Sequence, residues 1–144
     1  MTVIAMTIAP TEGAPLETRD ELTLTTGVGI DGDRHAGRKR QVTVVSTGEL
    51  AEAARAFGSD FDGVATRRNI VVDAGTLPRA HGTRFSIGEV EFEVWRDCAP
   101  CNLMDETFGD GAREALRDKC GIAASVVQGG TIRLGDPLAL PDLG

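Results

Sequence analysis

The sequence predicts a mainly β fold, a compact strand-rich barrel or tightly curled sheet with about two short helices. Three observations lead to this prediction. The length of 144 residues fits one domain. Short apolar segments outnumber the crossover helices that a parallel α/β fold needs. The 18 glycines and the 4% of aromatic residues indicate many turns and close backbone approaches. We therefore expect residues 1–144 to form a single domain.

Short apolar or alternating segments predict the strands. They are residues 3–8, 22–25, 41–45, 69–72, 84–87, 89–95, 122–127 and 131–134. The alternation is plainest in residues 89–95, where Val90, Phe92 and Val94 share one face and glutamates occupy the other. Two pairs are predicted to form hairpins: 84–87 with 89–95, and 122–127 with 131–134 across Gly129 and Gly130.

Two helices are predicted between the strands. Ser46 and Glu49 have the spacing of a capping box, with Ser46 at the N-cap. An apolar stripe follows at helical spacing, and Gly58 ends the helix. The stripe comprises Leu50, Ala53, Ala54 and Phe57. A second helix is predicted over residues 111–119, with its stop at Gly121.

Composition and charge limit the classes of partner. Hydrophobic residues make up 41% and charged residues 26%, as in a folded globular protein. No window approaches the ~18 apolar residues of a membrane helix, and the first ten residues lack the basic segment of a signal peptide. The net charge of −7 disfavours nucleic acid and anionic membranes. We expect a cytoplasmic protein that binds neither nucleic acid nor membranes. The odd number of three cysteines argues against a disulfide framework.

A glycine-rich loop follows the second predicted strand. Residues 27–32 have the spacing G-x-G-x-x-G, but no helix is predicted after them, so a dinucleotide site is disfavoured. Four cations then lie within residues 34–40. Glycine-rich backbone and arginine side chains together bind anions, although a solvated charged loop has the same pattern. Asp31, Asp33 and His35 offer a third interpretation, as metal ligands on one face of an extended segment.

Two further motifs carry candidate chemistry. Arg67, Arg68 and Asn69 open a predicted strand, where an amide suits the edge of a heterocycle and surface charge is the alternative. Cys98 and Cys101 form a C-x-x-C motif. It fits a dithiol without the usual βαβ context or half of a zinc site, which Cys120 with His35 or His81 would complete. It also fits one thiolate in an anion pocket, as a sulfur carrier or soft-metal ligand. Buried, inert cysteine is the alternative for each residue.

Taken in order, six segments resemble the MOSC domain, named after the C-terminal domain of molybdenum cofactor sulfurases. The segments are GVGIDGDRHAG, RQVTVVS, TRRNIVV, RFSIGEVEFEV, CAPCNLM and GIAASVVQGGTIRLGDPL, spread over residues 27–138. The resemblance implies a small strand-rich barrel with few helices. It also implies a pocket for the molybdenum cofactor (molybdopterin), a pterin dithiolene that carries a phosphate and molybdenum.

The resemblance also implies roles for single residues. Arg67 would hold the phosphate or pterin and Asn69 the pterin edge, with Arg68 beside them. Asp33 and His35 would shape the mouth of the pocket. The candidate cofactor-binding residues are thus Arg67, Asn69, Arg68, Asp33, His35 and Ser46.

The cysteines are the candidate catalytic and metal-binding residues. Cys101 matches the pocket cysteine of the family and would carry a persulfide or lie near the metal. Cys120 is the downstream candidate for a molybdenum ligand. Cys98 resembles the extra cysteine of one subset of the family and ranks lower.

Three hypotheses follow for the function. The first is a molybdenum-dependent reductase of N-hydroxylated small molecules that takes electrons from an external donor, since no electron-transfer or desulfurase domain is expected here. The alternative is a non-enzymatic carrier of sulfur or of the cofactor. It would receive sulfur on Cys101 from a cysteine desulfurase and serve a molybdoenzyme. The third is a structural zinc or dithiol protein built on Cys98 and Cys101, and zinc is the less expected metal.

Overall fold

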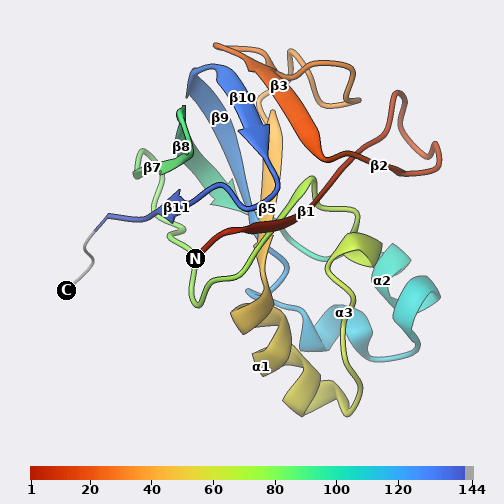
Figure 1. The fold of residues 1–144 in the computed structure, drawn as a ribbon. Coiled ribbons are helices and arrows are strands. Elements are labelled where there is room, and N and C mark those ends of the chain that lie inside the picture. Colours follow the sequence, from red (N-terminus) through yellow and green to blue (C-terminus); the bar gives the residue numbers. More distant parts are fainter. Residues whose placement is uncertain (142–144) are drawn as a thin grey trace.

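Strands dominate the computed structural model, which describes residues 1–141. The strands are β1 (Val3–Ile8), β2 (Glu17–Thr18), β3 (Glu21–Thr25), β4 (Gly29–Ile30), β5 (Val42–Ser46), β6 (Ile70–Val72), β7 (Arg84–Ile87), β8 (Val90–Asp97), β9 (Ile122–Gln128), β10 (Gly130–Arg133) and β11 (Leu138–Ala139). The helices are α1 (Thr47–Phe57), the 3-10 turn η1 (Val64–Thr66), α2 (Asn102–Phe108) and α3 (Ala112–Ala115). The three α-helices gather at one end of the strands (Figure 1). The predicted mainly β fold class is confirmed.

The strands form two sheets. The larger sheet has the order β11-β7-β8-β9-β5-β6-β1-β2, and the smaller has the order β10-β3-β4. β5 and β6 are parallel, and the other strand pairs in the described chain are antiparallel. β5 lies between β6 and β9 and is buried along its whole length, which explains its run of apolar and β-branched residues.

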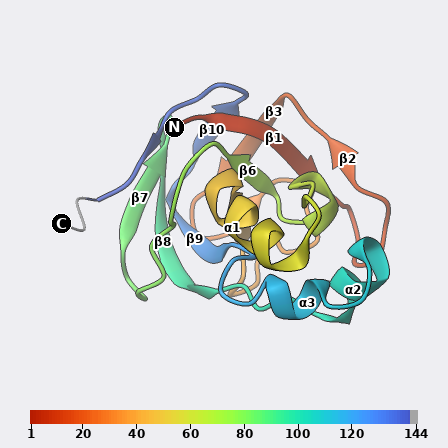
Figure 2. The ribbon, with the colours of Figure 1, turned by 90° about the horizontal axis from the view of Figure 1, so that it is seen from below.

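The larger sheet curls until its two ends approach each other. The amide of Val3 donates to the carbonyl of Asp136 (3.0 Å), Gly135 donates to Val3 (2.8 Å), and Leu138 donates to Met1 (3.0 Å). These bonds join the start of β1 to the segment that leads into β11. Viewed from the helical end, the strands curve around the centre of the molecule and α1 lies over it (Figure 2). The closure is therefore barrel-like, as the sequence predicts.

Apolar residues pack on both sides of the larger sheet. The cluster inside the curl includes the stacked rings of Phe85 and Phe92, whose centroids lie 5.1 Å apart. The second cluster lies between the sheet and the helices, and it comprises Val45, Leu50, Ala53, Phe61, Val71, Met104, Ala112, Leu116 and Cys120. No helix within residues 1–141 is both long and apolar enough to cross a membrane.

Helix α1 has the ends that the sequence predicts. The Ser46 hydroxyl accepts from the amide of Glu49 (3.2 Å), and Gly58 ends the helix with a φ of 90°. One carboxylate oxygen of Glu49 lies 3.4 Å from the Ser46 hydroxyl, and the other pairs with Arg79 at 2.6 Å. Thus α1 is joined at its first turn to the segment that precedes β7.

Two local predictions are wrong. β9 and β10 do not form a hairpin: β9 pairs with β5 and β8, while β10 pairs with β3 in the smaller sheet. The single residue between them, Gly129, is too short for a hairpin loop. Its backbone packs so closely on β3 that a Cβ would lie 2.3 Å from the carbonyl oxygen of Leu24. The predicted helix at 111–119 is shortened to α3, and the helix α2 was not predicted.

The side chain of Asn69 joins three strands. Its Oδ1 accepts from the backbone amide of Thr43 on β5 (3.0 Å), and its Nδ2 donates to the carbonyl of Thr7 on β1 (3.2 Å). Its own amide donates to the hydroxyl of Thr43 (2.8 Å). Asn69 is fully buried, so water cannot replace these partners.

We expect Asn69→Ala to lower the free energy of unfolding by about 2–4 kcal/mol, because it leaves the Thr43 amide and the Thr7 carbonyl buried without partners. Urea denaturation measures this loss. The matched control is Asn102→Ala, at an exposed asparagine that accepts one hydrogen bond from Arg113. It should cost less than about 0.5 kcal/mol. Equal losses in the two variants would contradict the role given to Asn69.

Candidate functional site

The candidate site begins at the pair of arginines that precedes β6. Arg67 has a φ of 63°, in the left-handed region, which costs a residue with a side chain roughly 1–2 kcal/mol. This turn sends the two side chains to different neighbours. The Arg67 guanidinium donates to the carbonyl of Ala14 (2.8 Å), whereas Arg68 reaches the ends of β8 and β9.

The guanidinium of Arg68 is buried among backbone and sulfur acceptors. Its Nε donates to the carbonyl of Cys120 (2.7 Å), and its Nη2 lies 3.4 Å from both the carbonyl of Ala99 and the Sγ of Cys120. Only 6% of the residue is exposed. Arg68 therefore ties the segment after β8 to the segment before β9 and places a fixed positive charge beside the Cys120 thiol.

Gly121 brings Cys98 and Cys120 into the same region. The carbonyl of Gly121 accepts from the amide of Cys98 (2.9 Å). Gly121 has a φ of 92°, and a Cβ there would lie 2.3 Å from the carbonyl oxygen of Val44. A residue with a side chain would push the start of β9 away from β5 and with it both cysteines.

Next to these cysteines lies a cavity of about 280 Å³, which we call the thiol cavity. It is lined by Arg40, Trp95, Arg96, Asp97, Cys98, Ala99 and Ala123. The Nε of Arg40 is buried and has no hydrogen-bond partner within residues 1–141. A buried donor without an acceptor costs free energy, so the cavity has the chemistry to take an anion or another acceptor against Arg40.

The two buried thiols are held in their neutral form. Burial raises the pKa of Cys98 and of Cys120, and the charge of Arg68 opposes the rise for both. Arg40 opposes it for Cys98 as well. A thiolate in this region therefore depends on those arginines.

Arg79 fixes one wall of the thiol cavity. Its Nε donates to Asp97 at 2.7 Å and its Nη1 to Glu49 at 2.6 Å. The Nη2 of Arg79 is also buried without a partner in the described chain. This ion-pair network holds the end of β8 against the first turn of α1.

The loop at residues 33–40 contributes Arg40 to the thiol cavity. The carboxylate of Asp33 accepts from the amides of Ala9 (3.1 Å) and His35 (3.2 Å), and it pairs with Arg34 (3.1 Å). The second nitrogen of the Arg34 guanidinium donates to the carbonyl of Arg67 (3.1 Å). Desolvation, reinforced by the positive charge of Arg34, lowers the pKa of His35 to about 4. His35 is therefore neutral at pH 7 and adds no charge to the site.

Comparison with known proteins identifies the family. The sequence matches the MOSC domain over residues 31–139. The chain belongs to the MOSC domain family. A search among curated proteins gave no match.

Solved structures share the fold of this MOSC domain. The YUAD protein from Bacillus subtilis superimposes with a TM-score of 0.80 at 21% identity, over 96% of this chain and 94% of that one. YiiM from Geobacillus stearothermophilus superimposes with a TM-score of 0.72 at 17% sequence identity, over 99% of this chain and 76% of that one. YiiM from Escherichia coli superimposes with a TM-score of 0.70 at 24% sequence identity, over 100% of this chain and 71% of that one.

The structure of this MOSC domain brings some of the predicted site residues together. Arg68 contacts Cys120, and Asp33 and Arg67 are joined through Arg34. The other predicted cofactor-binding residues lie elsewhere or serve the fold. The side-chain amide of Asn69 bonds to β1 and β5 at the strand junction. Ser46, also fully buried, caps α1 and donates to the carbonyl of Gly75 (2.7 Å).

From the sequence, Cys101 ranks above Cys98 as a site residue, but the structure places Cys98 nearer to the cavity. Cys101 is exposed at the start of α2, and it does not line the thiol cavity. Cys98 is in the wall of the cavity, and Cys120 is fully buried against Arg68. No group of three or more potential ligands among the described residues could hold a metal ion, so the four-ligand zinc hypothesis lacks its ligands.

Sequence reasoning missed four residues of this site. Trp95, Arg96 and Asp97 line the cavity, and Arg79 positions Asp97. The first three are adjacent to the C-x-x-C motif at the end of a predicted strand, and that position was a usable signal. Arg79 lies in an irregular segment and had no such signal.

We expect one thiol to react rapidly with a disulfide reagent in the native protein, because Cys101 is exposed while Cys98 and Cys120 are buried with raised pKa values. In urea all three should react. Absorbance of the released thiol measures both counts, and Cys101→Ser should remove the rapid phase. Rapid labelling of a second cysteine would contradict this arrangement.

His35 should make stability depend on pH. Its pKa is about 4 in the folded protein and near 6.5 in the unfolded chain. As the pH falls from 6.5 to 4, the unfolded chain therefore binds a proton that the folded protein does not bind, and the folded state loses stability. The contribution is fully present above pH 6.5. At pH 5 it has fallen by up to about 2 kcal/mol.

Urea denaturation at pH 7.5 and pH 5 of the wild type and of His35→Gln measures this effect. The variant should lose less stability than the wild type over this range. Asn102→Ala, which changes an exposed residue that does not titrate, is the control and should show the same pH dependence as the wild type. A pH dependence unchanged in His35→Gln would show that His35 does not titrate in this way.

Proposed function

We propose that this MOSC domain binds the molybdenum cofactor at the thiol cavity and reduces N-hydroxylated small molecules with it. The observation that carries the proposal is the buried Nε of Arg40, which has no acceptor among the described residues. It lies in a cavity that also contains a second arginine and a thiol. A phosphate or another anionic group would satisfy this donor.

The local charge also fits an anionic group. The protein has a net charge of −7, yet this region is locally positive. The charges of Arg34, Arg38 and Arg40 lower the pKa of His35. Those of Arg40 and Arg68 oppose the rise in the pKa of Cys98. Asp97 is the acidic residue in the cavity wall, and Arg79 neutralises it. Arginine forks suit phosphate geometry better than lysine does.

The size of the cavity favours a bound group that extends beyond it. The thiol cavity, at about 280 Å³, lies at the lower end of the range for ligand pockets. A second hollow of about 300 Å³ shares Trp95 with it and is lined also by Lys39, Gln41, His81, Glu93, Val94 and Ser125. The charged end of the cofactor suits the first space. The second has a mixed lining, in which polar groups such as Lys39 and Ser125 suit the hydrogen-bonding edge of a pterin.

Each side chain at the cavity has a distinct task in this proposal. Arg40 and Arg96 hold the anionic part of the cofactor. Arg68 and Arg79 keep the cavity wall in place through Cys120 and Asp97. Cys98 lines the cavity and is the thiol best placed to contact the bound group. Cys120 does not line it and is packed against Arg68.

The overall reaction needs an external reductant. A hydroxylamine, two electrons and two protons give an amine and water. When bound, the molybdenum would supply the two-electron chemistry, and the protein would supply orientation. The electrons would come from a separate donor protein, and we expect the donor and the substrate in the cytoplasm. Nucleic acid and membranes have no part in this proposal.

The exposure of Cys101 favours a second candidate, a sulfur carrier. A thiolate at Cys101 would attack the outer sulfur of a persulfide on a cysteine desulfurase. The desulfurase would leave as a thiolate, and Cys101 would carry the persulfide to a molybdoenzyme. Incubation with a desulfurase should then add the mass of one sulfur atom to the wild type and not to Cys101→Ser.

Cofactor content tests the main proposal. Protein purified without oxygen from a host that makes the molybdenum cofactor should hold molybdenum and pterin near one per chain. Arg40→Ala should retain about tenfold less, because a charge-assisted hydrogen bond is worth about 1.5–3 kcal/mol. Arg55→Ala, at an exposed arginine on α1, is the matched control and should retain the wild-type amount. Wild-type protein without either component, or equal retention in the two variants, would overturn the proposal.

A further inference from the structure

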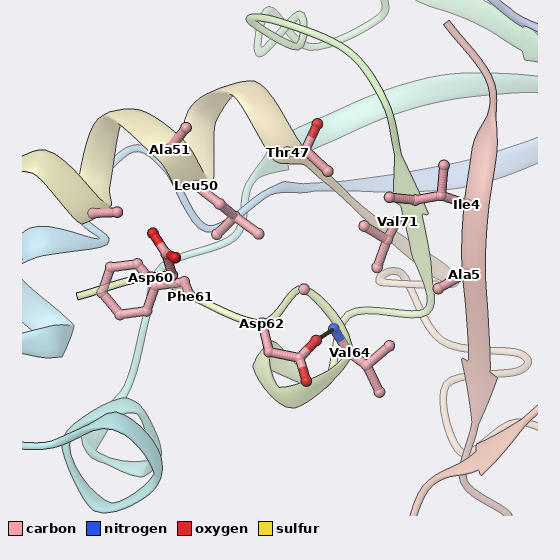
Figure 3. A pocket seen from close by; sticks show the side chains of 12 residues that line it. Ile4, Ala5, Thr47, Leu50, Ala51, Asp60, Phe61, Asp62, Val64 and Val71 are labelled. Carbon is pink, nitrogen blue, oxygen red and sulfur yellow. Dashed lines mark hydrogen bonds between the residues drawn. The ribbon is translucent and has the colours of Figure 1, made fainter.

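A second binding site is formed beside α1, apart from the thiol cavity. It is a hollow of about 360 Å³ between α1, β1, β6 and the segment at residues 60–64, and we call it the apolar hollow (Figure 3). Leu50 and Phe61 line it on one side, and Ile4, Val64 and Val71 on the other. The apolar hollow and the thiol cavity share no lining residue.

Small residues keep the apolar hollow open. Ala51 and Ala54 face it from α1, where longer side chains would fill the space. Gly63 allows the loop to approach β6, because a Cβ there would lie 2.8 Å from Cγ1 of Val71. At the rim, Ile4 remains 49% exposed on the outer face of β1. Covering this apolar surface would favour binding of an apolar group.

The charged groups at the apolar hollow are all acidic. Asp60 and Asp62 belong to its lining, and among the described residues no lysine, arginine or histidine does. Neither carboxylate forms an ion pair within residues 1–141. Asp62 accepts one hydrogen bond, from the amide of Val64 (3.0 Å). Both residues are exposed and can meet a ligand from solvent.

We infer that the apolar hollow binds a small amphiphilic amine, with its hydrocarbon body between Leu50, Phe61 and Val71 and its ammonium group against Asp60 and Asp62. The volume suits a ligand of fragment to small-drug size. Charge complementarity selects a cation over a neutral or anionic ligand with the same body. This inference does not depend on the function proposed for the thiol cavity.

Three probes with the same body test the selection by charge: phenylbutylamine, phenylbutanol and phenylbutanoate. Titration of isotope-labelled protein by NMR gives both the affinity and the site. We expect shifts at the amides of Leu50, Val64 and Val71. The amine should bind about three- to tenfold more tightly than the alcohol, and the acid should bind most weakly. The advantage of the amine should shrink at high salt, because exposed charges are screened.

Two variants separate the apolar and charged contributions. Asp60→Asn with Asp62→Asn should bring the affinity for the amine down to that for the alcohol and leave the alcohol unchanged. Ala51→Phe should weaken all three probes by filling the hollow. Ala56→Phe, the same change at another exposed position of α1, is the control and should bind as the wild type does.

Three results would overturn the inference. They are the absence of shifts at those amides, equal affinities for the three probes, and an amine preference that survives in the double asparagine variant. That variant changes exposed side chains, and the new amide at position 62 would still present an oxygen to the Val64 backbone N–H. It therefore tests the charge even if a phenylalanine variant fails to fold. Binding lost equally in Ala51→Phe and Ala56→Phe would also contradict the inference, because Ala56 does not line the hollow.

Discussion

The junction of β1, β5 and β6 at Asn69 is the constraint on which the candidate site depends. The amide side chain of Asn69 is fully buried, and its partners on Thr43 and Thr7 belong to two different strands. It cannot rotate without leaving polar groups unpaired in the core. Arg67 and Arg68 immediately precede this fixed point, so the places where their side chains leave the backbone are fixed too. The left-handed turn at Arg67 then sends one guanidinium to the loop around Ala14 and the other to Cys120.

Because burying Arg68 is costly, its guanidinium needs acceptors, and these bring the segments of the two buried cysteines together. A buried guanidinium is stable only with good acceptors, and these come from the segments on either side of the Cys98–Gly121 contact. The same positive charge limits the rise in the pKa of both thiols that burial causes. An anion bound at Arg40 would act in the opposite direction, because it offsets the positive charge that favours a thiolate. Anion binding and thiolate formation at Cys98 therefore compete for the same arginine.

Local sequence patterns predicted those parts of the fold that local physics decides. The hairpin of β7 and β8 and the capped ends of α1 depend on alternation, a glycine turn and a hydroxyl at the N-cap, and all are confirmed. β2, β4 and β11 have two residues each, which is too short for any periodicity. The partners of β9 and β10 depend on a close packing of Gly129 against β3 that no local pattern records. For the site, alternation along β8 could not predict which cysteine points inward, because the register shifts between Val94 and Arg96 just before the motif. Cys98 lies in a cavity wall, whereas Cys101 lies at the surface at the N-cap of α2.

Helix α1 has a second role that its amphipathic pattern does not reveal. Glu49 has the position of the capping-box acid, but its buried carboxylate pairs with Arg79, and Arg79 also holds Asp97 in the wall of the thiol cavity. A buried carboxylate without a partner would be strongly unfavourable, so the pair with Glu49 holds Arg79 in the position from which it reaches Asp97. The next residue along the helix, Leu50, lines the apolar hollow instead. One turn of α1 thus supplies a wall residue to the apolar hollow and an anchor to the thiol cavity. The position of this turn depends in turn on Ser46, which ends β5 and caps α1, and β5 is the strand that Thr43 joins to Asn69.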